Sequence, residues 1–578
     1  MDRKSLIAIA LSVVGLFAWQ WYVSKYYKPQ LQAAAAANAA ASPVAAQAAP
    51  VATPTPAQTP LPVSSMNARA ESLSNDKAEY VFNNDSGGIE QVILFLHMGE
   101  NKEHVSLNRS RTMPIGAMGF SPGEVLGGFE MSTSAANGEA TFQQKTADGL
   151  QITKHFTLTK DASVPYSVNL EVTFHNPGQA SMRVPDFFVG TGGAAPIHVN
   201  DLPMYTRFDW GHGTSMSTID VNWFSASSVP LIGIPIHGER PLYLESKSDI
   251  EWAAVTSQYF CTIITAKNGG RPQSVWAKRF NAPSFNGSPV FGIQGGLNQA
   301  GFQLAAGATE TRTYQIYAGP KEIPNLRKQG LTQDKVMNFG MFGIVSESLL
   351  WAMNKLHTFL GSYAAAIIVL TLLIKSALWP VQNKATREMR KMSLLSPKMT
   401  EMRVKYKDDP QKMNEETMKL YREYGVNPFS GCLPMVIQIP IFFGFYSMLG
   451  TAIELRNSSF FWIADLSQPD TVLHLLSFPI NVLPIVMAGT MIWQMVITPK
   501  TGDAMQQRML YFMPVIFLVF CYNYASGLAL YWTTQNLFSI VQLYLTRNQP
   551  LPTLEKKSVV AKREAAQVKK KSKNQHKP

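Results

Sequence analysis

One positively charged residue, Lys375, lies inside a long apolar run at residues 359–379. The run is long enough to cross a bilayer at about 1.5 Å per residue of helix. A lysine in such a helix costs about 2.5–3.5 kcal/mol on insertion scales, so its position indicates a functional site. Thr371 lies one helical turn away on the same face of that helix.

Two other apolar runs also carry polar groups at membrane depth. Gln438 lies about seven residues into the run at 431–450, and residues 533–536 place a polar patch near the middle of the last run. No acidic residue lies in these runs to pair with Lys375, which disfavours a proton relay. The pattern predicts a hydrated, positively charged cavity open toward the cytoplasm. The alternative is a lysine that extends its amine to the lipid headgroups.

The chain of 578 residues has room for more than one unit, and only 16% of its residues are charged. Its hydropathy pattern predicts a polytopic α-helical membrane protein with six transmembrane helices. The expected spans are residues 6–23, 359–379, 431–450, 475–497, 509–522 and 525–545. Residues 1–28 read as an uncleaved N-terminal anchor, because aromatic residues and lysines follow the apolar core. A cleaved signal peptide is the alternative.

Residues 66–330 read as a large antiparallel β-sandwich domain. The clearest strand is 166–174, where apolar and polar residues alternate without a break. Further strands are expected at residues 79–82, 89–96, 151–158, 242–245, 259–266 and 311–317. Scattered histidines and widely spaced cysteines give neither metal-ligand spacing nor a disulfide framework, so we expect no catalytic site and no cofactor here.

Four segments connect or flank these units. Residues 29–65 form an Ala/Pro-rich linker that we expect to be disordered. Residues 331–357 predict an amphipathic helix lying in the membrane interface. Residues 384–424 predict a helical hairpin with its turn at Asp408, Asp409 and Pro410. The tail at 547–578 is strongly basic, and it suits either ribosomal RNA or anionic lipid.

The distribution of Lys and Arg sets the expected orientation. The segment at 384–423 holds 11 Lys and Arg residues and the tail holds 10, whereas the segment at 451–474 holds only Arg456. By the positive-inside rule, both termini and the helical hairpin are then cytoplasmic and the β domain is periplasmic. A secondary transporter would be expected to show repeats and midplane carboxylates, and neither is found. An anchored periplasmic enzyme or sugar-binding protein would leave five spans unexplained.

Three motifs resemble the YidC membrane protein insertase family, whose superfamily includes the mitochondrial and chloroplast insertases. They are VNPFSGCLPMVIQIPIFFGFY at 426–446, MQQRMLYFMPVIF at 505–517 and SGLALYWTTQNL at 526–537. The match covers roughly residues 340–546. The N-terminal anchor and the large periplasmic domain are similar to the Gram-negative form.

The resemblance implies a non-enzymatic insertase and chaperone of the bacterial inner membrane. It would act on nascent membrane proteins, alone or with the Sec translocon, and would touch lipid and, through the tail and hairpin, the ribosome. Residues 358–546 would form five core helices around a hydrophilic groove, and residues 66–330 a β-supersandwich. The family's groove cation is usually arginine, and here it is Lys375. Thr371 and Gln438 map to other groove positions, and Tyr531 and Trp532 map to substrate-contacting aromatics.

Overall fold

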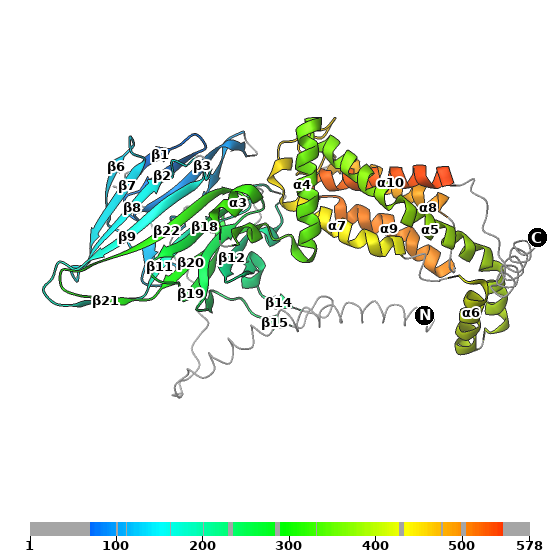
Figure 1. The fold of residues 1–578 in the computed structure, drawn as a ribbon, viewed down its shortest axis with the longest axis horizontal. Coiled ribbons are helices and arrows are strands. Elements are labelled where there is room, and N and C mark those ends of the chain that lie inside the picture. Colours follow the sequence, from blue (N-terminus) through cyan, green and yellow to red (C-terminus); the bar gives the residue numbers. More distant parts are fainter. Residues whose placement is uncertain are drawn as a thin grey trace, which may run out of the picture.

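The computed structural model describes residues 70–546, with gaps at 100–101, 111, 162, 200, 229–234, 284–288, 331, 408, 427–432, 476–477 and 499–503. Strands make up most of the described chain to residue 320, and helices make up most of the described chain after it. Figure 1 shows these two parts side by side along the long axis, with α4 between them. The expected anchor at 1–28, the linker at 29–65 and the tail at 547–578 lie outside the described residues.

The β part is built around a nine-stranded antiparallel sheet. Its strand order is β13 (Ser215–Asp220), β12 (Arg207–His212), β17 (Ile250–Thr256), β18 (Phe260–Asn268), β22 (Thr309–Pro320), β9 (Ser167–His175), β8 (Gln151–Leu158), β7 (Glu139–Lys145) and β6 (Glu130–Ser134). The inward residues of β8 and β9 alternate with exposed or half-buried ones, as period-two patterning requires. All seven strands expected from the sequence are confirmed, with ends that differ by a few residues.

Two smaller antiparallel sheets complete the β part. The first has the order β16 (Tyr243–Ser246), β19 (Ser274–Ala282), β20 (Val290–Gln299), β11 (Phe187–Ala194) and β5 (Met118–Gly119). The second has the order β1 (Ala70–Ser74), β2 (Ala78–Asn83), β3 (Gly88–Met98) and β4 (His104–Leu107). Strands β11 and β20 pack on β17 and β18, so the core lies between two layers, as in a sandwich. The short pairs β10 (Met182–Val184) with β21 (Phe302–Leu304) and β14 (Ser227–Ser228) with β15 (Pro235–His237) lie at its margins.

A series of helices comes after the β part. They are α3 (Ile323–Gln329), α4 (Gly343–Leu360), α5 (Tyr363–Lys405), α6 (Pro410–Tyr424), α7 (Leu433–Thr451), α8 (Val482–Ile497), α9 (Ala504–Cys521) and α10 (Ser526–Thr546). Helix α10 packs against α5 and α8, and α4 packs against α5 and α7. The end of α5 and the whole of α6 lie farthest from the β part (Figure 1). There, Leu395, Tyr421 and Val426 form a small core of their own, which packs the end of α5 against α6 where the sequence predicts a hairpin.

The expected count of six transmembrane helices is not confirmed. In the part of the chain that the structure describes, Tyr363–Met402 is the one helix long and apolar enough to cross a membrane. Three further apolar helices, at Val436–Thr451, Val482–Ile497 and Tyr511–Cys521, are shorter than a full span. The first expected span, at 6–23, is outside the described residues.

The helix expected at 475–497 is wrong at its start. Residues Thr471–Leu475 form strand β23, Phe478–Asn481 form β24, and α8 begins only at Val482. Pro479 explains the difference, because a proline disfavours helical backbone in the residue before it. The span expected at 359–379 lies within α5 except for its first residues, because α5 begins at Tyr363. Helix α5 continues through Pro380 and Pro397, since a proline kinks a helix without necessarily ending it.

The amphipathic helix expected at 331–357 is broken at its start. Two 3₁₀ turns, Gln333–Met337 and Gly340–Phe342, precede α4. Gly340 has a φ of 69°, a left-handed conformation that interrupts a right-handed helix and suits glycine. The apolar residues therefore divide: Val336 and Met337 are buried, whereas Ile344 is 86% exposed.

Candidate functional site

Lys375 lies between α5 and α10. Ser362 caps the start of α5, where its hydroxyl accepts a hydrogen bond from the amide of Ala365, and Lys375 follows about three turns later. The side chain is only 6% exposed, and Nζ donates a hydrogen bond to Oγ of Ser539 at 3.4 Å. Among the described residues, no carboxylate forms an ion pair with this amine. The amine thus faces the neighbouring helix α10, and it has donors left to satisfy.

Gln438 connects α7 to α10. Its Nε2 donates to the hydroxyl of Tyr531 at 2.8 Å and to Oε1 of Gln535 at 2.9 Å. Ser539 Oγ in turn donates to the backbone carbonyl of Gln535 at 2.9 Å. Lys375, Ser539, Gln535, Gln438 and Tyr531 therefore form one connected set across three helices, which we call the polar network.

Ser539 was not predicted from the sequence, and Gln535 was predicted only as part of the polar patch at 533–536. Tyr531, Gln535 and Ser539 are spaced by four residues, which places them on one face of α10. Gln542 continues this face and donates to Oδ1 of Asn383 on α5 at 3.1 Å. The four-residue spacing was the signal that could have identified them.

The other predicted site residues lie apart from the polar network. Thr371 is 1% exposed, and its hydroxyl donates to the carbonyl of Ile367 within α5. Trp532 is half-buried in a cluster of aromatic rings, with centroids 4.7 Å from Phe442 and 4.5 Å from Phe517. The ring of Tyr531 stacks on Phe445 at 4.0 Å. The structure therefore brings together Lys375, Gln438 and Tyr531, but not Thr371 or Trp532.

A second polar cluster joins the β part to the helices. Arg456 lies just after α7 and donates from Nη2 to the carbonyl of Met98 at 3.0 Å, with Nε2 of His198 at 2.8 Å from the same nitrogen. Its guanidinium also lies over the rings of Tyr259 and Phe260. We call this set the Arg456 joint.

Other hydrogen bonds cross the same boundary. The hydroxyl groups of Tyr205 and Tyr524 are 2.9 Å apart, and Gln258 Nε2 donates to the carbonyl of Gly450 at 2.8 Å. Burial, and then the nearby charge of Arg456, lowers the pKa of His97 to about 4. His97 is therefore neutral at pH 7 and adds no second positive charge beside Arg456.

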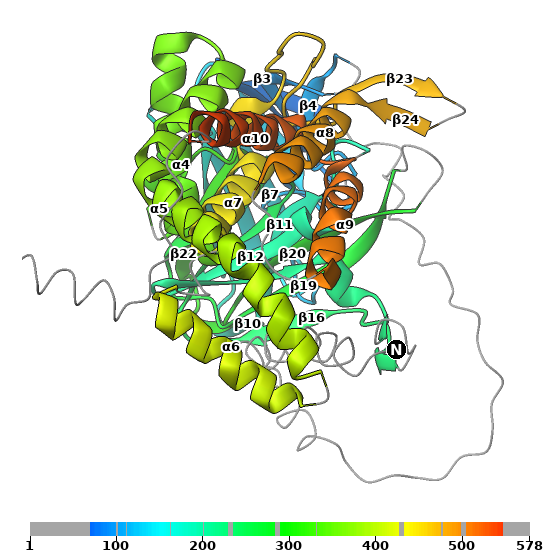
Figure 2. The same ribbon diagram turned by 90° about the vertical axis from the view of Figure 1, so that its right-hand side faces the viewer.

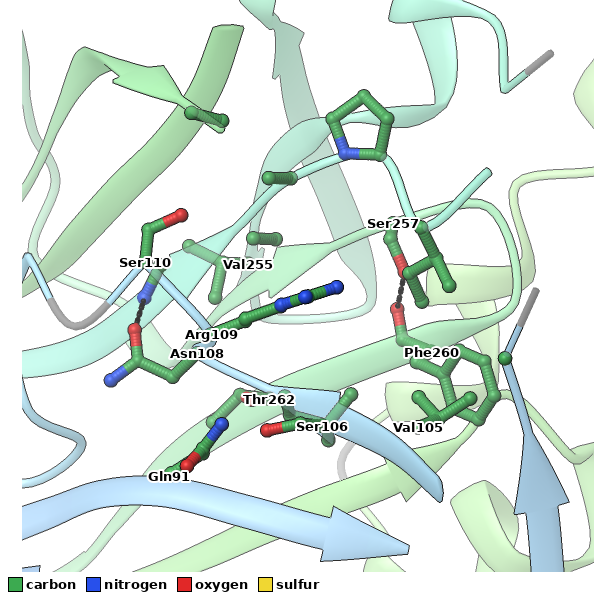
Figure 3. Close-up of a pocket in the computed structure, with 18 of the residues that line it drawn as sticks. Gln91, Val105, Ser106, Asn108, Arg109, Ser110, Val255, Ser257, Phe260 and Thr262 are labelled. Atoms are coloured by element: carbon green, nitrogen blue, oxygen red, sulfur yellow. Dashed lines mark hydrogen bonds between the residues drawn. The ribbon is translucent and has the colours of Figure 1, made fainter. Parts of the chain in front are cut away.

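A cavity of about 710 Å³ lies within the β part, far from the polar network. It opens between β3 and β4 on one side and β17 and β18 on the other. Figure 3 shows Arg109 among its lining residues, with Ser106, Val255 and Thr262 nearby. No residue of the polar network lines this cavity.

The described residues contain no candidate metal-binding site. Among them, no group of three or more His, Cys, Asp or Glu residues could hold a metal ion. Cys261 and Cys521 are buried free thiols. Burial raises the pKa of Cys261 to about 12, so this thiol stays protonated and unreactive at neutral pH.

A helical unit with apolar spans, joined to a large antiparallel β domain, defines an integral membrane protein that carries a folded domain beside the membrane. Two family models match it: "YidC periplasmic domain" over residues 124–352 and "60Kd inner membrane protein" over residues 355–552. The chain belongs to the YidC family. It is accordingly an inner-membrane protein with a periplasmic, β-rich domain.

Relatives match over most of the chain. A protein of Citrifermentans bemidjiense named membrane protein insertase YidC is 30% identical over 95% of this chain and 99% of its own length. A protein of Pelobacter propionicus with the same name is 31% identical over 71% of each chain. The crystal structure of an active YidC insertase with its first transmembrane domain resolved covers 83% of this chain and 93% of its own, at 17% identity and a TM-score of 0.35.

Proposed function

We propose that this protein inserts nascent membrane proteins into the bacterial inner membrane and assists their folding, alone or with the Sec translocon. The relatives named as insertases support the activity. The observation that carries the mechanism is the amine of Lys375, which is buried with one hydroxyl partner at 3.4 Å. Such an amine gains by meeting a carboxylate, because a buried charge without a counterion is costly.

The physical problem is the transfer of a polar tail across about 30 Å of hydrocarbon. Every unpaired backbone group and every charge opposes that step. A hydrophilic groove between α5, α7 and α10 would shorten the apolar path, and Lys375 would attract acidic residues of the tail. The apolar segment of the substrate would then move into lipid, driven by its own burial. No nucleotide or cofactor is required.

In this mechanism the side chains of the polar network line the groove, together with Thr371 and Trp532, which lie outside that network. Gln438 and Thr371 would offer hydrogen bonds to the passing segment, while Tyr531 and Trp532 would contact its apolar part. The groove opens when α5 and α10 separate, which exchanges the single bond from Lys375 to Ser539 for bonds to substrate and water. Lysine lacks the planar fork of arginine, so it would attract acidic tails without a fixed bidentate geometry.

The proposed orientation follows the positive-inside rule. The protein would be multi-pass, with both termini and the α5–α6 hairpin in the cytoplasm. The hairpin and the basic tail would face the ribosome or anionic lipid, and the β domain would face the periplasm, where the Sec translocon is also accessible.

Reconstitution tests the proposal. The purified chain is placed alone in liposomes, and a small membrane protein with an acidic tail is added. We expect protease protection of that tail above the level of empty liposomes. Lys375→Glu should abolish protection, because it replaces attraction by repulsion, whereas Lys375→Arg should be close to wild type.

Lys384→Glu is the matched control, because Lys384 lies on the same helix but is exposed. It should retain insertion. Normal insertion of acidic tails by the Lys375→Glu variant would disprove the charge mechanism while leaving insertase activity intact. Absence of protection with the wild-type chain would disprove insertion without a partner.

A further inference from the structure

The β23–β24 hairpin is apolar and exposed. All five residues of β23 are exposed, and Val472, Leu473, Leu475 and Phe478 each have more than half of their surface open, at 52%, 51%, 61% and 57%. Residues 471–481 contain no Asp, Glu, Lys or Arg. Leu473 pairs with Ile480 and Leu475 pairs with Phe478, so these four apolar side chains share one face of the hairpin. The opposite face carries His474 and Pro479, so the apolar side chains of the hairpin are concentrated on one open face.

The base of the hairpin is held firmly by the helices. Asn481 Nδ2 donates to the carbonyl of Tyr522 at 2.6 Å, and the Tyr522 hydroxyl donates to the carbonyl of Pro479 at 2.7 Å. Asp470 is 3% exposed and accepts a hydrogen bond from the amide of Leu483 at 2.6 Å. These bonds fix the direction in which the hairpin projects. Figure 2 looks along the length of the molecule and shows the hairpin extending sideways beyond α8.

The hairpin continues an apolar surface that belongs to the membrane part. It leads directly into α8, whose 16 residues span only about 24 Å against about 30 Å of hydrocarbon. Ile485 and Val486 continue the exposed apolar surface onto α8, at 49% and 41%. Phe461 and Trp462, at 85% and 52%, lie in the same connection between α7 and α8. Aromatic residues are enriched at such depths because their rings suit the membrane–water interface.

We propose that the β23–β24 hairpin, with Phe461 and Trp462, is seated in the outer leaflet of the bilayer at the boundary between headgroups and acyl chains. A two-stranded hairpin has unpaired backbone groups at its edges, and these exclude a deeper position in hydrocarbon. The hairpin projects sideways and carries no Asp, Glu, Lys or Arg, and both properties favour a position at the boundary between headgroups and acyl chains. The inference does not depend on insertase activity.

Fluorescence of the full-length chain in vesicles of phosphatidylethanolamine and phosphatidylglycerol tests whether the hairpin lies in the membrane interface. Leu473→Cys is labelled with an environment-sensitive dye in a Cys432→Ala background, since Cys261 and Cys521 are buried. The matched control is Leu244→Cys, which is equally exposed at 52% but lies on β16 in the β domain. We expect blue-shifted emission at 473 and at least two-fold stronger quenching by a shallow lipid-borne nitroxide than at 244.

Three results would overturn the proposal. In the first, the dye at residue 473 is as exposed to water as the dye at residue 244. The second is a dye shielded from water but not quenched by lipid, which would indicate a second copy of the chain on the hairpin. The third is stronger quenching by a deep nitroxide than by a shallow one.

The label itself is apolar, so a further variant checks whether the native side chains, and not the dye, hold the hairpin in the membrane interface. Val472→Ser and Leu475→Ser are added to the labelled Leu473→Cys chain. Quenching by the shallow nitroxide should then fall toward the level of the control at 244. Unchanged quenching would show that the dye alone enters the membrane, and it would contradict the proposal.

Discussion

At the scale of single residues, Lys154 is an unusual component of the β domain. The side chain is fully buried in β8, its Nζ donates to the carbonyl of Ser86 at 3.4 Å, and it lies 4.9 Å from the ring centroid of Phe129. Burial lowers the pKa of this amine from 10.5 to about 7. The folded protein therefore holds fewer protons than the unfolded chain between pH 7 and 10.5, and its stability rises with pH across that window.

Lys154→Met should raise the free energy of unfolding at pH 7. The fall of the pKa from 10.5 to about 7 corresponds to roughly 5 kcal/mol, at about 1.4 kcal/mol per pKa unit. The lost hydrogen bond to Ser86 offsets part of it, so the expected gain is roughly 2–4 kcal/mol. The advantage over wild type should shrink as the pH approaches 10.5, where the unfolded lysine also loses its proton. Denaturant unfolding of the full-length chain in nanodiscs, followed by tryptophan fluorescence at about pH 7 and pH 9.5, measures both effects.

Lys160→Met, at an exposed position, is the control and should leave stability unchanged. A Lys154→Met variant less stable than wild type at both pH values would contradict this account of the buried amine.

The sequence contained part of this result. Period-two alternation places Lys154 on the same face as Ile152 and Phe156, so its inward direction could be predicted. Lys375 was equally visible as a charge in an apolar run. The partners of both amines could not be predicted, because Ser86 and Ser539 are brought there by long-range packing.

At the scale of elements, the close packing of α4 against α7 depends on one glycine, Gly444. A Cβ added at Gly444 on α7 would lie 2.7 Å from Cγ1 of Val345 on α4. Helix α4 can therefore approach α7 only where no side chain intervenes. On α8, by contrast, Gly489 has open space where its Cβ would be.

Gly444→Ala should destabilise the α4–α7 contact. We expect a loss of roughly 1–3 kcal/mol, the usual cost of overpacking a close contact. Gly489→Ala is the matched control, and it should be neutral or slightly stabilising because alanine favours helix. Thermal unfolding in nanodiscs compares the two variants. Equal melting temperatures would show that α4 adjusts without strain.

Elements were predicted well where their patterns were long and local. Seven strands and the α5–α6 hairpin followed from periodicity alone. Apolar composition did not distinguish a helix from a hairpin at 475–481, where Pro479 decided the outcome. Helix α5 also continues through Pro380 and beyond the end of the expected span at residue 379.

At the scale of the whole molecule, the Arg456 joint ties the β domain to the helices. Arg456 reaches Met98 and His198, which belong to the β part, from a position just after α7. The hydroxyl pair of Tyr205 and Tyr524 adds a second connection. Buried hydrogen bonds to a charged group are stronger than neutral ones, so the arginine should dominate.

Arg456→Met should uncouple the two parts more than it weakens either one. Nε and Nη1 of Arg456 are buried and have no hydrogen-bond partner among the described residues, so removal of the charge offsets part of the lost bonding. We expect a single unfolding transition in calorimetry to separate into two, because cooperativity requires a tight interface. Tyr205→Phe, which loses one neutral hydrogen bond, should keep the transitions closer together. A single sharp transition in Arg456→Met would indicate that other contacts hold the joint.

The unbroken course of α5 has a mechanical consequence. At 43 residues the helix is about 65 Å long, and the stretch from Pro380 to Lys405 accounts for about 37 Å of it. Prolines are where helices bend. A change of about 5° at Pro380 would displace the far end by roughly 3 Å, so the helix acts as a lever with its fulcrum beside Lys375. A small bend at Pro380 would thereby be amplified at the hairpin, about 37 Å away.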